Sequence, residues 1–131
     1  MKTILILDDE QAVRNSFADY FEDGQWRPIH AESAEEALEL LESESPDAVV
    51  VDVRLPGIDG NDFIRKVYWR NPKTAFIICT GSPEFCVPPD LQVLPRVSNH
   101  LFKKPVARMA DLEEAVLRII GFIHGKEIED E

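Results

Sequence analysis

Short apolar segments typical of β-strands alternate along this chain with segments that have helical spacing, and this alternation restricts the fold most. The clearest strand is Ala48–Val51, a continuous and mostly β-branched run typical of a parallel strand covered by helices on both faces. Repeated strand-helix alternation predicts an α/β fold with a doubly wound, five-stranded parallel sheet. The predicted strands are Thr3–Leu7, Trp26–His30, Ala48–Val51, Thr74–Cys79 and Ser98–Phe102.

The predicted helices are Gln11–Glu22, a helix capped by Ser33, Asn61–Arg70 and Met109–His124. Ser33 is the first residue of the box Ser-Ala-Glu-Glu, a common helix start. The fourth helix position differs from the others, because prolines recur from Pro83 to Pro95 and remove backbone donors. We therefore expect an irregular segment over about residues 82–97, with isolated helical turns only.

Length and charge limit the function. The 131 residues, 44% of them hydrophobic, predict one domain over residues 1–124 and an acidic tail over 125–131, without an output domain. A net charge of −11 argues against direct nucleic-acid binding. The apolar run before Asp8 is too short for a membrane span or signal peptide. We expect a cytoplasmic protein without membrane insertion.

Polar residues follow the predicted strands where each strand ends. In parallel sheets, ligands bind beyond the carboxyl ends of the strands. The sequence therefore predicts that acids, a hydroxyl and an amine converge on one rim of the sheet. These residues are Asp8, Asp9 and Glu10 after the first strand, Asp52 after the third, Thr80 and Gly81 after the fourth, and Lys104 after the fifth.

This set of side chains fits metal-assisted phosphoryl transfer. Carboxylates around a shallow cup suit Mg²⁺, which prefers oxygen ligands and offsets the repulsion among Asp8, Asp9 and Asp52. Lys104 and Thr80 offer a positive charge and a donor to the oxygens of a phosphoryl group. A carboxylate can also be the nucleophile, and Asp52 lies centrally enough to form an aspartyl-phosphate.

The combined motifs resemble the receiver domain of two-component response regulators. They are the Asp8-Asp9 pair, the run VVVDVRLPGIDG, Thr80-Gly81 at a strand end, and Lys104-Pro105. The resemblance covers about residues 1–124 and implies the flavodoxin-like strand order 2-1-3-4-5 of chemotaxis receivers. It also implies a signalling module that catalyses only its own phosphotransfer and dephosphorylation.

The resemblance assigns roles to individual residues. It implies that Asp52 accepts the phosphoryl group from a sensor histidine kinase or a histidine phosphotransfer protein. Mg²⁺ would be bound by Asp9, Asp52 and the backbone carbonyl of Arg54, while Asp8 would act through water.

Three further roles concern the strand ends nearest the C-terminus. Thr80 would move to hydrogen-bond the phosphoryl oxygen, and Lys104 would pair with it. Pro105, in this family often preceded by a cis bond, would direct the lysine. Strand alternation places Lys103 on the opposite side from Lys104.

Two features depart from the family pattern. Many receivers carry an aromatic switch residue three positions before the lysine, where this chain has Leu101. The irregular segment replaces a regular fourth helix, so we do not expect the standard dimer through the fourth helix, fifth strand and fifth helix. The alternative function is a receiver-like scaffold that binds partners without phosphorylation-dependent switching. An aspartate-nucleophile phosphatase is disfavoured, because its acids would follow a DxD pattern.

Overall fold

A single five-stranded parallel sheet with the order β2-β1-β3-β4-β5 forms the centre of the molecule, which confirms the predicted order. The computed structural model describes residues 1–129, with side chains as far as Gly125. The strands are β1 (Thr3–Leu7), β2 (Arg27–Ala31), β3 (Ala48–Asp52), β4 (Ala75–Thr80) and β5 (Phe102–Lys103). The helices are α1 (Gln11–Asp23), α2 (Ala34–Leu40), α3 (Gly60–Val67), α4 (Pro89–Gln92) and α5 (Met109–Glu129).

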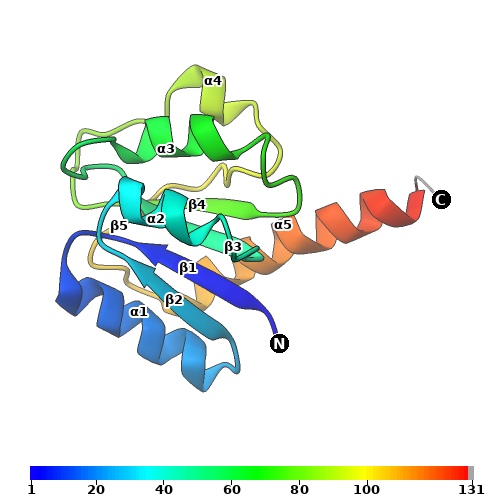
Figure 1. Ribbon diagram of the computed structural model, residues 1–131, viewed down its shortest axis with the longest axis horizontal. Coiled ribbons are helices and arrows are strands. Elements are labelled where there is room, and N and C mark those ends of the chain that lie inside the picture. Colours follow the sequence, from blue (N-terminus) through cyan, green and yellow to red (C-terminus); the bar gives the residue numbers. More distant parts are fainter. Residues whose placement is uncertain (130–131) are drawn as a thin grey trace.

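The helices form two layers, one on each face of the sheet (Figure 1). Alternate residues of β1 point to opposite faces, as the two-residue period of a strand requires. Ile4 and Ile6 pack with the buried side chains of α1 and α5. Leu5 and Leu7 pack with those of α2, α3 and α4. All residues of β3 are buried, as predicted from its continuous apolar run.

The strand register places the site residues at one edge. Leu7 lies opposite Val51 in the β1–β3 pair, and Asp52 lies opposite Cys79 in the β3–β4 pair. Thr80 lies opposite Lys103 in the β4–β5 pair. The residues that follow these positions therefore emerge together at the carboxyl ends of the strands.

Several predicted boundaries were wrong. The fifth strand is Phe102–Lys103 instead of Ser98–Phe102. Val97 makes only an isolated bridge to Phe76, and the Ser98 hydroxyl bonds the backbone of His100 in a local turn. This turn interrupts the pairing that the apolar pattern had predicted.

Two helices also end elsewhere than predicted. α3 ends at Val67, because residues 68–70 form turns instead of the continued helix expected to Arg70. α5 continues to Glu129, past the predicted end at His124, so residues 125–129 of the predicted tail are helical. Residues 130–131 of that tail lie outside the described part of the chain.

The irregular fourth segment was predicted correctly. It contains one helical turn, α4, with Pro88 and Pro89 at its start. Leu91 anchors this turn in the core, and the Asp90 carboxylate accepts two hydrogen bonds from the Arg65 guanidinium of α3. A short, tethered turn thus covers the sheet where a longer helix was not possible.

A buried arginine fixes the chain between α4 and β5. The Arg96 side chain donates hydrogen bonds to the backbone carbonyls of Tyr68, Asn71 and Thr74, and its guanidinium stacks 3.7 Å from the Tyr68 ring centroid. These carbonyls satisfy a cation that burial would otherwise destabilise. Among the described residues, no helix is both long and apolar enough to cross a membrane.

Candidate functional site

The ends of three strands bring Asp8, Asp52 and Lys104 into direct contact. The Lys104 Nζ lies 2.8 Å from Asp8 Oδ2 and 3.4 Å from Asp52 Oδ2. Asp8 and Asp52 are only 3% and 4% exposed. One ammonium group therefore contacts two buried carboxylates, and the three side chains meet at the rim of the sheet where they were expected to converge.

Local hydrogen bonds fix Asp8. Its Oδ1 accepts from the backbone N–H of Glu10, which precedes the first residue of α1. Its backbone carbonyl accepts from Arg14 Nη1 at 2.7 Å. The role of Arg14 was not predicted, because an arginine on the first turns of a helix carries no sequence signal of its own.

Asp52 is positioned by a loop that folds back over the end of β3. A Cβ atom at Gly60 would lie 2.2 Å from the backbone oxygen of Asp52, so only glycine permits this close approach. Gly57 has φ +78°, which also favours glycine. The Glu35 carboxylate of α2 accepts the Ile58 N–H at 3.0 Å and holds the loop from outside.

The electrostatics of the cluster favour a bound cation. Burial, and next the Asp8 charge, raise the pKa of Asp52 to about 6 from its ordinary 3.8, although Lys104 opposes this rise. Burial works against the Lys104 ammonium, but its contacts with Asp8 and Asp52 together raise its pKa. Lys104 lies closer to Asp8, so its charge only partly compensates Asp52.

An open pocket of about 780 Å³ lies beside this cluster. Its walls include Asp9, Asp52, Arg54, Lys104 and Pro105, to which the resemblance assigns roles, and also Glu10 and Gly81.

The acids at this pocket form an oxygen-rich group. Carboxylate oxygens of Asp8, Asp9 and Glu10 lie within 4.8 Å of one another. An all-oxygen donor set of this kind fits Mg²⁺ better than a softer metal. Asp9 is exposed and Asp52 is buried, and both line the pocket. The pocket therefore offers one solvent-accessible carboxylate and one shielded carboxylate.

Thr80 is fully buried, and its hydroxyl does not line the pocket. Its Oγ1 accepts the backbone N–H of Ser82 at 3.1 Å. Ser82 also accepts at Oγ from Arg54 Nη2 and at its carbonyl from Lys103 Nζ. Ser82 thus connects the loops after β3 and β4 with the last residue of β5. Lys103 does not contact the Asp8 carboxylate, which pairs with Lys104.

Leu101 and Pro105 lie on either side of β5. Leu101 is half-buried and packs against the apolar cluster under α2, α3 and α4. Phe102 packs into the opposite cluster. The Lys104–Pro105 peptide bond is cis, as the resemblance implied.

Chemically, this arrangement presents a buried carboxylate next to a fixed ammonium at the bottom of an acidic pocket. A preformed positive charge near a nucleophilic oxygen stabilises the negative charge that develops on a transferring phosphoryl group. Six of the eleven residues that line the pocket are charged, and four of these six are acidic.

Comparison with protein families identifies a match over most of the chain. Residues 4–116 match the response regulator receiver domain. The positive alginate biosynthesis regulatory protein of Pseudomonas aeruginosa is 36% identical over 118 residues, covering 86% of this chain and 45% of that protein. The transcriptional regulatory protein AfsQ1 of Streptomyces coelicolor is 36% identical over 81 residues, covering 62% of this chain and 36% of that protein. The chain thus spans less than half the length of these curated relatives.

Solved structures give the same fold. A CheY-like response regulator receiver domain protein from Methanospirillum hungatei has a TM-score of 0.82 and 25% identity, with 96% of this chain and 98% of that chain covered. The response regulator TrrA of Thermotoga maritima, solved in complex with Mg²⁺-BeF, has a TM-score of 0.77 and 23% identity, with 91% and 99% covered.

Proposed function

Because the chain belongs to the family of response regulator receiver domains of two-component systems, we propose that it accepts a phosphoryl group on Asp52. The donor is a sensor histidine kinase or a histidine phosphotransfer protein in the cytoplasm. As a receiver domain it is a signalling module, and the only catalysis that we assign to it is its own phosphotransfer and dephosphorylation.

One observation carries this proposal: Asp52 is buried beside Lys104 and opens on an acidic pocket. An Oδ atom of Asp52 bonds to phosphorus while the phosphorus–nitrogen bond of the donor phosphohistidine breaks. The Lys104 ammonium balances the charge on the phosphoryl oxygens. Asp8 keeps that ammonium oriented through its 2.8 Å contact.

Mg²⁺ is the cofactor that these donors fit. Asp9, Asp52 and the Arg54 carbonyl would hold it, with Asp8 acting through water. When bound, the ion neutralises the phosphoryl oxygens and the clustered carboxylates. The raised pKa of Asp52 supports this assignment, because burial and then the Asp8 charge disfavour the ionised carboxylate, which a bound cation would stabilise.

The signal is proposed to pass through Thr80. Its hydroxyl turns from the Ser82 N–H toward the phosphoryl oxygen, and the loop after β4 follows, so that phosphorylation favours one of two surface conformations. Because α4 is a single turn, we do not propose the standard dimer through α4, β5 and α5.

Leu101 favours a second candidate, the scaffold that binds partners without switching. A leucine packed against the core under α2, α3 and α4 offers no aromatic ring to exchange between two positions. In this case the site would bind Mg²⁺ but leave the outer surface unchanged on phosphorylation.

The test is incubation with Mg²⁺ and a small acyl-phosphate donor, followed by intact mass measurement. We expect a Mg²⁺-dependent gain of one phosphate in the wild type and in Asp19→Asn, an exposed control on α1, and none in Asp52→Asn. Phosphate on another residue, or no gain also with histidine kinases, would contradict the proposal. Amide shifts of the modified protein confined to the pocket would favour the scaffold.

A further inference from the structure

A stretch that begins within α3 carries basic residues but no acids, although the chain as a whole is acidic. No Asp or Glu occurs over residues 63–83, although the chain has 25 acidic residues and a net charge of −11. Four of its 14 basic residues lie in this stretch: Arg65, Lys66, Arg70 and Lys73. Trp69 lies among them and is 75% exposed.

The structure gathers these residues at the end of α3 and in the turn that leads to β4. The N–H groups of Arg70 and Asn71 both bond to the Val67 carbonyl, so the backbone keeps turning after the helix ends. We call the exposed set Lys66, Trp69, Arg70 and Lys73 the Trp69 surface.

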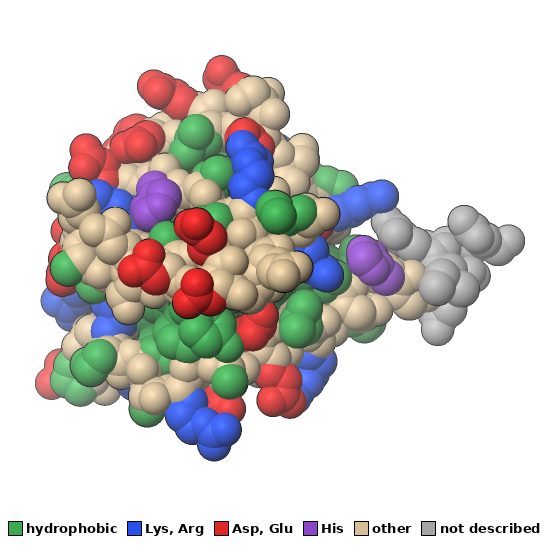
Figure 2. All heavy atoms as spheres, turned by 90° about the horizontal axis from the view of Figure 1, so that it is seen from below, with side chains coloured by type: hydrophobic (Ala, Val, Ile, Leu, Met, Phe, Trp, Pro, Cys, Tyr) green, Lys and Arg blue, Asp and Glu red, His purple; other side chains and the backbone are tan. Residues whose placement is uncertain are grey.

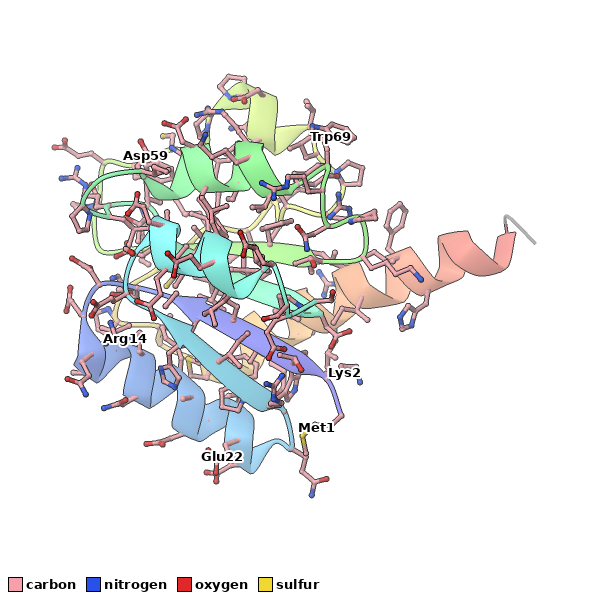
Figure 3. All side chains as sticks on the ribbon, viewed as in Figure 1. Met1, Lys2, Arg14, Glu22, Asp59 and Trp69 are labelled. Carbon is pink, nitrogen blue, oxygen red and sulfur yellow. The ribbon has the colours of Figure 1, made fainter. Side chains whose placement is uncertain are left out.

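The Trp69 surface lies away from the phosphorylation pocket. Figure 3 labels Trp69 at the upper right of the layer that contains α3, whereas Arg14 and Asp59, which flank the loops of the pocket, are labelled on the left-hand side. This follows from topology, because the turn before β4 is at the amino end of the sheet and the pocket is at the carboxyl end.

The ring of Trp69 has a rigid support. It meets Tyr68 edge-on, with centroids 4.8 Å apart. Tyr68 is in turn covered by the Arg96 guanidinium, which three backbone carbonyls fix in place. A tryptophan held on such a base loses little conformational freedom when a partner covers it.

The basic side chains of this surface differ in their availability. Arg65 is engaged with Asp62 and Asp90. Lys66 and Arg70 form no side-chain ion pair or hydrogen bond within the part of the chain that the structure describes. Cations near a helix C-terminus also suit the helix dipole, which accounts for Lys66. The dipole does not account for an exposed tryptophan between two unpaired cations.

We propose that the Trp69 surface binds a short acidic segment of a partner protein that carries a bulky apolar side chain. The apolar side chain covers the Trp69 ring, and carboxylates pair with Lys66 and Arg70. Tryptophan and arginine are the residue types that most often dominate binding energy at protein interfaces. The charge of this surface is opposite to that of the chain as a whole.

The charge distribution argues against other occupants. The chain as a whole carries a net charge of −11, and Figure 2 shows several acidic side chains near the middle of the face seen from below. A long polyanion such as nucleic acid, or an anionic membrane, would therefore be repelled by the chain beyond the Trp69 surface. A second copy would bring its own charge of −11. An exposed tryptophan offers on the order of 150 Å², far less than the roughly 800 Å² per partner of a stable dimer.

The test uses labelled synthetic helical peptides in fluorescence anisotropy at low salt. One peptide has glutamates on one face and leucines on the other, a second replaces glutamate by lysine, and a third replaces leucine by alanine. We expect only the first to bind well, and equally well to Asp52→Asn, because the surface is remote from the pocket. Equal peptide binding by the wild type and Asp52→Asn would show that the Trp69 surface acts whether or not Asp52 is the phosphoacceptor.

Variants identify the surface. Lys66→Glu with Arg70→Glu should weaken binding by about tenfold or more, and Trp69→Ala by about tenfold. Arg118→Glu, an exposed α5 charge reversal, should leave the affinity unchanged. Circular dichroism confirms that each variant is folded. Equal binding by the charge-reversed variant would overturn the proposal, as would tighter binding of oligo-dT or phosphatidylserine vesicles than of the acidic peptide. Self-association abolished by Trp69→Ala would assign the surface to a second copy instead.

Discussion

Replacing the proposed phosphoacceptor should make the metal-free protein more stable. Asp52 is 4% exposed, and its folded-state pKa of about 6 exceeds its ordinary 3.8. The native state therefore binds a proton more tightly than the unfolded chain. An ionised Asp52 thus destabilises the fold above about pH 6, and this penalty declines as the pH falls toward 3.8.

The size of the pKa rise of Asp52 gives the magnitude of the expected change in the free energy of unfolding. A rise of about two pKa units corresponds to roughly 3 kcal/mol at pH 7.5, which is an upper value because the site is coupled to Asp8 and Lys104. Asp52→Asn removes the penalty but also the 3.4 Å contact with Lys104. We therefore expect a net stabilisation of about 1–2 kcal/mol at pH 7.5, falling to about half at pH 5.

Urea unfolding in EDTA, followed by circular dichroism at both pH values, measures this difference. Asp8→Asn is the matched control, because it removes the same charge but breaks the closer 2.8 Å contact to Lys104. It should lower stability by about 2 kcal/mol. Added Mg²⁺ should stabilise the wild type more than Asp52→Asn. If Asp52→Asn is no more stable than the wild type at pH 7.5, or its advantage grows as the pH falls, the reasoning is refuted.

Three further substitutions test the supporting structure. Gly60→Ala places a methyl group 2.2 Å from the Asp52 carbonyl, so we expect a loss of about 3 kcal/mol or more in urea unfolding; a near-neutral effect would show that α3 shifts freely. Arg96→Leu leaves three carbonyls without their donor and should cost about 3 kcal/mol by thermal unfolding, with Arg96→Lys intermediate. Glu113→Ala removes the acceptor of the Trp26 indole N–H, and should cost about 1 kcal/mol and shift tryptophan emission, whereas Glu113→Gln should retain most of both.

The continuous apolar runs of the buried strands were sufficient to predict a parallel sheet, whereas the strand order was predicted only from the resemblance to receiver domains. Ala48–Val51 has no polar residue that could face water, so its place at the centre follows from its composition. The fifth strand was misplaced because Val97 and Phe102 are equally apolar, and only the tertiary contact of Val97 with Phe76 shows that the pairing is interrupted.

The sequence predicted those residues of the candidate site that lie at the carboxyl ends of the strands. Asp8, Asp52 and Lys104 meet because parallel strands bring their carboxyl ends to one edge. The contact of Arg14 with the Asp8 carbonyl was not predictable, because it depends on the path of a long side chain that no periodic pattern records. The same holds for Arg96, whose burial contradicts the usual exposure of arginine.

Ser82 couples the positions of three chain segments around the pocket, because it forms hydrogen bonds to all of them. Its N–H, hydroxyl and carbonyl are committed to Thr80, Arg54 and Lys103, which follow or end three different strands. The Thr80 hydroxyl can leave its place only if the Ser82 N–H loses its acceptor. A displacement of Ser82 would then release an arginine and a lysine on the outer surface together. A single hydroxyl rotation inside the protein would therefore alter the charge pattern that a partner meets outside.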